Sequence, residues 1–200
     1  PDGNFTWYDY DAAGRVAMEA RAWKDVDVPV LESNALMAAA AVTLYTYSPV
    51  NAADAGMARP RNPRTITALA ENQVVSKTYF SYVAGDNGEI EEIKEECASP
   101  AAAFGAAGNR RTRTTFYSDA EELWPGAVKR VEYPDGRLDR FVMERGNYVD
   151  DGDEPGSFIV GSGDFVRSTV IHGTVLHPEG TGKTTREVSV RRVLGEEVLR

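Results

Sequence analysis

Two aspartates separated by a tyrosine, Asp9 and Asp11, lie in the stretch YDYDAAGRV (residues 8–16), and their spacing could support chemistry. On a β-strand, residues two apart share one face, so the two carboxylates could hold a cation or act as an acid/base pair. The same stretch also fits the end of one strand, a turn ending at Gly14, and a return strand that begins at Arg15. The choice between these interpretations decides whether the chain is read as an enzyme or as an architectural element.

A second stretch, VEYPDGRLDRF (residues 131–141), repeats the turn residues of the first but not its pair of acids. Its tyrosine is flanked by Glu132 and Pro134, where the first copy has two aspartates. A turn with a capping aspartate and a glycine at positive φ is therefore what recurs, and we interpret both stretches as hairpins. A weaker echo, VSVRRVLGEEVL (residues 188–199), keeps only the glycine. The residues that we expect to form the two turns are Tyr10, Asp11, Gly14, Arg15, Tyr133, Asp135, Gly136 and Arg137.

The stretch GTGKTT (Gly180–Thr185) resembles part of a phosphate-binding loop, in which a glycine-rich turn leads from a strand into a helix. The full motif requires a glycine where this chain has His177, and the following residues, TREVSVRRV, are typical of a strand. A glycine-rich hairpin turn explains the stretch better, and we expect no cofactor.

The densest acidic cluster is DDGDE (Asp150–Glu154), whose carboxylates and carbonyls could hold calcium. The cluster lacks the ligand spacing of a known calcium loop, which favours a solvated surface loop. The two histidines, His172 and His177, are expected on opposite sides of a strand and the turn beyond it, which does not make a metal pair. Cys97 stands among glutamates, without the positive surroundings that activate a thiol. We therefore predict no catalytic residue, no metal site and no enzymatic activity.

The bulk composition indicates a folded protein whose surface is acidic. The chain has 200 residues, 42% hydrophobic and 26% charged, with a net charge of -9. These values are ordinary for a globular protein and make nucleic acid a poor partner. One cysteine excludes an internal disulfide, and no apolar run is long enough to span a bilayer. Since the chain opens at Pro1 and runs quickly into a strand-like pattern, we expect it to be an internal fragment of a longer protein.

Short runs rich in valine, threonine and aromatic residues, separated by glycine, aspartate and proline, predict an all-β fold of antiparallel hairpins in a twisted, extended sheet. Helix signals are limited to single turns, as at Ser118–Glu121 and after Ser99. The stretch EIEEIKEE (residues 89–96) fits either a helix or a hairpin arm, and we favour the arm. The predicted strands are residues 5–10, 42–47, 64–69, 74–83, 113–117, 128–133, 137–143, 165–176 and 184–193.

Aromatic side chains are distributed along the predicted strands on both faces. Exposed rings stack well on sugars, whereas rings on neighbouring strands also pack on each other within a sheet, and we favour the second interpretation. The aromatics that we single out for possible ligand stacking are Trp7, Tyr8 and Trp23.

The two turn stretches resemble the YD repeat of the RHS (rearrangement hotspot) family. That repeat has a tyrosine and an aspartate at a strand end, followed by glycine, arginine and an aliphatic residue. Tyr10-Asp11 with Gly14-Arg15-Val16 matches this pattern, and Tyr133 with Asp135-Gly136-Arg137-Leu138 matches it with a proline inserted. The segment of residues 167–190 is also similar to the connecting regions of such proteins. The resemblance covers both ends and the middle of the chain.

The resemblance implies a single YD-repeat segment over residues 1–200, in which hairpins form a strip of a shell around or beside another segment. In that family the shell sometimes encloses a C-terminal toxin or effector, and the resemblance implies a protein that is secreted or belongs to the cell envelope. The implied partners are neighbouring YD repeats, an enclosed effector and, for the alternative of an adhesion or carbohydrate-binding module, surface glycans. We expect hairpins near residues 5–24, 128–145 and 184–200, and loop excursions near 49–63 and 148–163.

Overall fold

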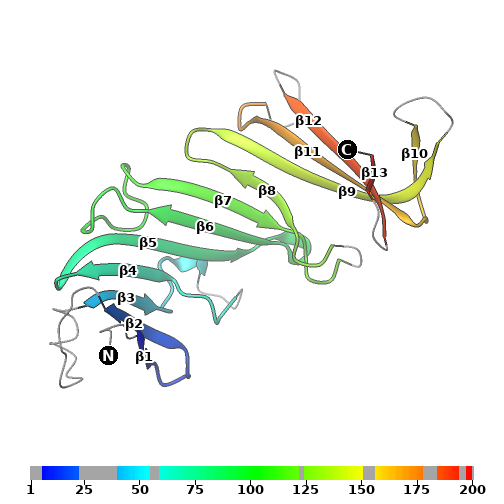
Figure 1. The fold of residues 1–200 in the computed structure, drawn as a ribbon. Helices are drawn as coiled ribbons and strands as arrows, with labels where there is room; N and C mark the ends of the chain where they lie inside the picture. The colour runs from blue at the N-terminus through cyan, green and yellow to red at the C-terminus, as the bar shows by residue number, and fades with distance from the viewer. Residues whose placement is uncertain are drawn as a thin grey trace. The chain divides into compact units, whose positions relative to one another are not determined.

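The computed structural model describes residues 6–22, 40–54, 59–121, 124–150, 156–177, 184–193 and 197–199 of the chain. The described residues are mostly β-strand, as Figure 1 shows. They divide into two compact units, one of Pro1–Ala84 with Glu91–Arg111, and one of Gly85–Ile90 with Thr112–Arg200. Within the described ranges, no helix is both long and apolar enough to cross a membrane.

The strands of the first unit lie in the sheet in the order in which they occur in the chain. Neighbours that follow each other in sequence pair antiparallel, so short turns connect several of them directly. The turn between β4 and β5 places Glu71 and Asn72 at positive φ, as the tightest hairpin turns require. The strands are β1 (Thr6–Tyr10), β2 (Val16–Ala22), β3 (Ala40–Thr46), β4 (Thr65–Ala70), β5 (Gln73–Ala84) and β6 (Ile90–Glu96).

One face of the first unit carries a small apolar core. Ala20, Val42 and Leu69 lie directly opposite one another on β2, β3 and β4 and are buried. Met18 and Leu44, two residues away on the same strands, pack against this cluster. Because alternate residues of a strand point to opposite faces, this register leaves Tyr8, Glu19 and their neighbours on the other face.

The second unit is also an antiparallel sheet, with strands in the order β7-β8-β9-β11-β12-β13 and β10 paired to β9. Strand β7 (Arg110–Phe116) begins in the first unit and continues into the second. Strand β9 is long because its N-terminal part pairs with β8 and β11 and its C-terminal part pairs with β10. The other strands are β8 (Val128–Glu132), β9 (Arg137–Val149), β10 (Ser157–Val160), β11 (Phe165–Thr174), β12 (Thr185–Arg192) and β13 (Glu197–Leu199).

Gly146 marks the point on β9 at which the pairing partner changes from β11 to β10. It lies opposite both Phe165 and Val160. A side chain there would overlap the backbone of Ile159, and one at Gly163 would overlap the backbone of Gly146. The close approach of three backbone segments therefore requires glycine at both positions.

The predicted fold class, an all-β sheet of antiparallel hairpins with few and short helical turns, is confirmed. The stretch 89–96 forms a hairpin arm, β6, as favoured. Ser118 and Ser99 each start a single hydrogen-bonded turn, as expected. The two 3-10 turns, η1 (Ala52–Asp54) and η2 (Asp86–Gly88), were not predicted. The predicted excursion near 148–163 contains β10, which the sequence pattern did not indicate.

Candidate functional site

The turn after β1 is built around Asp11. The N–H of Asp11 donates to the carbonyl of Arg15 (2.8 Å), and the N–H of Gly14 donates to the carbonyl of Asp11 (2.9 Å). Oδ1 of Asp11 also accepts the N–H groups of Ala13 and Arg15, each at 2.9 Å. Gly14 has a φ of +73°, a conformation that only glycine adopts without strain. The aspartate of this turn therefore caps backbone groups and is not half of a carboxylate pair with Asp9.

The side chain of Arg15 connects this turn to two other parts of the first unit. Its guanidinium binds Oδ2 of Asp11 through Nε and Nη2, both at 2.7 Å, and Nη1 donates to the carbonyl of Pro60 (3.2 Å). It also lies 4.0 Å from the ring centre of Tyr47. Side-chain and backbone hydrogen bonds from Arg15 hold the pKa of Asp11 below its ordinary value.

The turn between β8 and β9 uses the same residue types in a different arrangement. The N–H of Tyr133 donates to the carbonyl of Arg137 (2.9 Å), and the N–H of Gly136 donates to the carbonyl of Tyr133 (3.0 Å). Asp135 accepts Nε of Arg137 (2.8 Å), which lowers the pKa of the carboxyl group, and Gly136 has a φ of +82°. The guanidinium of Arg137 lies 4.7 Å from the ring centre of Tyr133.

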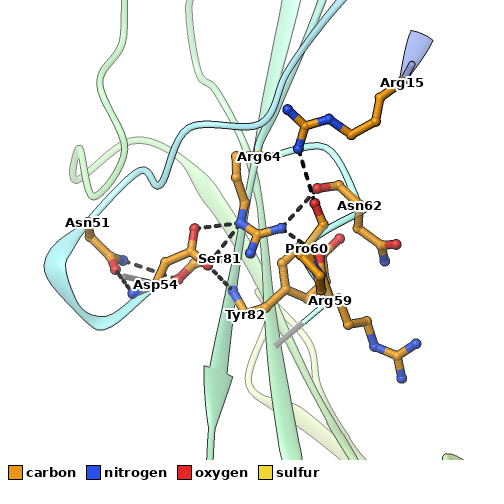
Figure 2. Close-up of polar contacts among 9 residues, drawn as sticks. All are labelled: Arg15, Asn51, Asp54, Arg59, Pro60, Asn62, Arg64, Ser81 and Tyr82. Atoms are coloured by element: carbon orange, nitrogen blue, oxygen red, sulfur yellow. Dashed lines mark hydrogen bonds and ion pairs between the residues drawn. The ribbon is translucent and has the colours of Figure 1, made fainter. Parts of the chain in front are cut away.

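A buried ion pair between Asp54 and Arg64 is the most enclosed polar cluster among the described residues (Figure 2). Nε of Arg64 donates to Oδ1 (2.9 Å) and Oδ2 (2.7 Å) of Asp54, and Oδ1 also accepts the backbone N–H of Tyr82 (3.1 Å). The N–H of Asp54 donates to Oδ1 of Asn51, whose Nδ2 donates to Oγ of Ser81 (3.3 Å). The cluster joins the 3-10 turn η1 to β5.

The guanidinium of Arg64 also organises the loop that precedes β4. Its Nη1 donates to the carbonyls of Arg59 (3.0 Å) and Asn62 (2.9 Å), and its plane lies 4.5 Å from the ring centre of Tyr82. Since the carboxylate and guanidinium of the pair are bound to each other and to the backbone, neither is available to a substrate or a metal. Burial raises the pKa of Tyr82, in keeping with the dry surroundings. The geometry is that of a structural anchor.

A second buried carboxylate, Glu95 on β6, holds the loop that leads to β7. Its Oε1 accepts the N–H of Gly105 (2.5 Å) and Nδ2 of Asn109 (2.6 Å), and its Oε2 accepts Nη2 of Arg111 (2.7 Å). Burial alone would raise the pKa of Glu95, but the hydrogen bonds from Asn109, Arg111 and Gly105 outweigh it and lower that pKa. This carboxylate, too, has its acceptor sites used by the fold.

A row of titratable side chains crosses the second unit. Oδ2 of Asp139 accepts the hydroxyl of Tyr133 (2.9 Å), and its Oδ1 lies 2.7 Å from Nδ1 of His172. Nε2 of His172 lies 3.5 Å from Oε1 of Glu187 on β12. The hydrogen bond that His172 donates to Asp139 is the main reason that the pKa of His172 is raised, and Glu187 acts in the same direction. The row has the composition of an acid/base array. Its side chains, however, bind one another across paired strands.

The aromatic residues singled out from the sequence do not share one surface. Trp7 lies opposite Ala20 and Tyr8 opposite Glu19, so the two rings point to opposite faces of the sheet. Both are exposed, as is Tyr10. Trp23 is outside the described residues.

Several other predicted features fall partly outside the described residues: residues 151–154 of the acidic cluster, residues 180–183 of the glycine-rich stretch and residues 194–196 of the third echo. In the ranges that are described, no three side chains of histidine, cysteine, aspartate or glutamate are grouped so as to hold a metal. His172 lies within β11, whereas His177 lies in the turn beyond it and pairs with Thr174. Burial raises the pKa of the Cys97 thiol, which makes it less nucleophilic.

The turn residues were found from the sequence, but the two buried carboxylates were not. Asn51 three residues before Asp54 is a local signal, because an asparagine side chain commonly accepts a nearby N–H in a turn. No signal in the sequence connects Asp54 to Arg64 or Glu95 to Arg111, since neither pair has a regular spacing.

Comparison with known proteins returns no relative: no family model, curated protein or solved structure matches the chain significantly. Function must therefore be argued from the geometry and from the turn motifs.

Proposed function

We propose that the chain is a structural segment of the RHS/YD-repeat kind, which contributes hairpins to a β-wall that encloses or displays another segment of the protein. The observation that carries this proposal is that the buried and half-buried carboxylates bind other parts of the fold. Asp11, Asp54, Glu95 and their arginine partners bind turns, loops and strands to one another. An enzyme would need some such groups directed at a substrate, and we accordingly propose that the chain is not an enzyme.

The sheet order supports the same proposal. Within the first unit every hairpin lies beside the next one in the chain, as repeated hairpins in a strip would. The residues of β1 are all exposed, and an open strand edge of this kind is suited to pairing with a further strand. Neighbouring YD repeats are the proposed partners at such an edge, and a C-terminal effector is the proposed content of the wall. A wall of this kind would belong to a secreted or cell-envelope protein.

Limited proteolysis of the full-length protein that carries this segment tests the proposal. An enclosed effector should resist protease in the unaltered protein and become sensitive when Gly14→Val and Gly136→Val together disturb the two turns. Asp9→Asn, on β1 just before the first turn, is the matched control and should leave the effector protected. An effector that is equally sensitive with and without the glycine substitutions, or a protein with no enclosed segment at all, would refute the wall.

The second candidate is a surface adhesion or carbohydrate-binding module, and it is favoured by the exposure of Trp7, Tyr8 and Tyr10 along β1. A glycan array would show saturable binding for such a module. Because Trp7 and Tyr8 point to opposite faces, one of the substitutions Trp7→Ala and Tyr8→Ala should abolish binding and the other should not. Binding that both variants retain would exclude this candidate.

A further inference from the structure

One face of the second unit is rich in arginine, although the chain as a whole has a net charge of -9. The register places Arg130 directly opposite Arg140, Arg140 opposite Ile171, and Ile171 opposite Arg186, so these side chains share one face of β8, β9, β11 and β12. We call this surface the arginine face. Its register also includes Arg113, Arg167 and Arg192.

Acidic residues are few on the arginine face. Among the described residues of β7, β8, β9, β11 and β12, the carboxylates that share it are Glu132 and Glu144. Glu132 pairs with Arg130 and Glu144 pairs with Arg167. The opposite face carries Asp139 and Glu187 against Arg137, Arg145 and Arg191, and Arg137 is already paired with Asp135. Positive charge is thus concentrated on one side of the sheet.

One feature of the arginine face favours the binding of a negative group. Like charges directly opposite each other on neighbouring strands are destabilising, yet Arg130 faces Arg140.

The arginine face also has a hollow with an apolar floor. The hollow has a volume of about 290 Å³ and lies over β9, β11 and β12. Val142, Thr169, Ile171 and Val188 form much of its lining, and the charged residues that line it are Arg186 and the ion pair of Arg167 with Glu144. A ligand that fills this hollow must present aliphatic groups as well as negative charges.

We propose that the arginine face binds an extended polypeptide segment that combines acidic and aliphatic side chains. Guanidinium groups bind carboxylates in a planar, two-point manner, and the apolar floor accepts a valine or leucine between the acids. A nucleic acid or a sulfated sugar would meet the arginines but would leave the floor unused, and the acidic remainder of the chain would repel a long polyanion. The inference concerns this face alone and does not require that the strip forms a wall.

Fluorescence anisotropy with the full chain tests this proposal. The probe is a labelled twelve-residue peptide of alternating glutamate and valine, at about 0.1 M salt, where charges beyond about 10 Å are screened. We expect saturable binding that Arg186→Gln weakens about tenfold, the effect of losing one charge-assisted hydrogen bond. Arg191→Gln is the matched control, because Arg191 lies on the same strand, is exposed, and points to the opposite face. It should change the affinity less than twofold.

Two comparison probes separate the proposed ligand from any polyanion. A glutamate–serine peptide of equal charge and a heparin dodecasaccharide should each bind at least fivefold more weakly than the glutamate–valine peptide. No saturable binding, equal losses from Arg186→Gln and Arg191→Gln, or equal affinity for heparin would each overturn the proposal. Thermal unfolding followed by circular dichroism verifies that both variants are folded.

Discussion

The turn after β1 and the turn between β8 and β9 contain the same four residue types. However, these residues do not all occupy equivalent positions in the two turns. In each, three residues lie between two closing residues that share a backbone hydrogen bond. The closing residues are Asp11 and Arg15 in one turn, and Tyr133 and Arg137 in the other. The glycine and the arginine therefore correspond, whereas the tyrosines and the aspartates do not.

The comparison shows that the position of the glycine in the turn is fixed, whereas the position of the aspartate can vary. The glycine must be third in the loop, because that position has positive φ in both turns. The aspartate binds the arginine from either of two positions, four residues before it or two residues before it. The surroundings differ as well: the Asp11 and Arg15 side chains are 24% and 32% exposed, against 56% and 68% for Asp135 and Arg137. The charged side chains of the first turn are partly covered, whereas those of the second are largely solvated.

Of all the substitutions, removal of the buried carboxylate of Asp54 should have the largest effect, and it should affect the first turn more than the second. Asp54→Ala leaves Arg64 charged and buried, so the free energy of unfolding should fall by about 3–5 kcal/mol. Arg64 also orders the loop that supplies the carbonyl of Pro60 to Arg15, so the first turn should lose protection from hydrogen exchange at Gly14. Urea denaturation and exchange measured by NMR provide both values. Equal loss of protection at Gly136 would contradict this account.

The two turn glycines should be equally sensitive despite their different surroundings. Apart from the chain neighbours, no atom lies within 4 Å of a Cβ added at Gly14 or Gly136, so the main cost of Gly14→Val or Gly136→Val is backbone strain. We expect each to lower stability by about 1–2 kcal/mol in urea denaturation. Asp9→Asn should change it by less than about 0.5 kcal/mol, since its side chain is exposed and, among the described residues, accepts the N–H of Tyr10 alone. Equal tolerance of Gly14→Val and Asp9→Asn would disprove the turn assignment.

The arginines should differ where the glycines do not. Arg15→Gln removes contacts with Asp11, Pro60 and Tyr47 and should destabilise the first unit by about 1 kcal/mol. Arg137→Gln removes an exposed ion pair and a contact with the ring of Tyr133, and it should cost less than Arg15→Gln. Chemical denaturation of both variants measures the two losses of stability. A larger loss from Arg137→Gln would show that exposure is not what distinguishes the two turns.

Acid should weaken both turns in the same direction. The pKa values of Asp11 and Asp135 are lowered by hydrogen bonds from their arginines, so the unfolded chain takes up protons first. The stabilisation is fully present above the unfolded carboxyl pKa of about 3.9 and is lost as the pH falls through the folded values. Carboxyl chemical shifts followed by NMR between pH 1.5 and 6 should report both titrations. A midpoint for either group at or above the unfolded value would exclude its ion pair in solution.

His172 should make the second unit less stable as the pH rises near neutrality, which is the opposite of the effect of the two aspartates. Its pKa is raised by Asp139, so its contribution to stability is complete below the unfolded value of about 6.5 and is lost as the pH rises through the folded value. His172→Gln should remove this dependence and leave that of Asp11 unchanged. Imidazole proton shifts in NMR measure the titration, and a midpoint below 6.5 would contradict the contact with Asp139.

Most strands could be predicted because their residues are β-branched or aromatic and end at glycine, proline or aspartate. The exception, β10, is four residues long and is defined by pairing with β9 at Gly146, a contact that no local pattern encodes. The hairpin turns could be predicted because a position with positive φ favours glycine, and this preference can be recognised in the sequence.

The buried cluster could not be predicted, because its formation depends on position in space. Arg59, Arg61 and Arg64 stand within six residues, and nothing local tells which of them is buried against Asp54. The arginine face is hidden for a similar reason. Its members are single residues on separate strands, and they share a surface only after the register is known.

The order of strands in the first unit has a consequence for synthesis. Each strand from β2 to β6 finds its earlier neighbour already made when it leaves the ribosome, because sequence neighbours are sheet neighbours. Such local pairing closes short loops and avoids the slow search for distant strands. The hairpins of this unit are therefore suited to fold one after another from the N-terminus, each on the edge that the previous one has just formed.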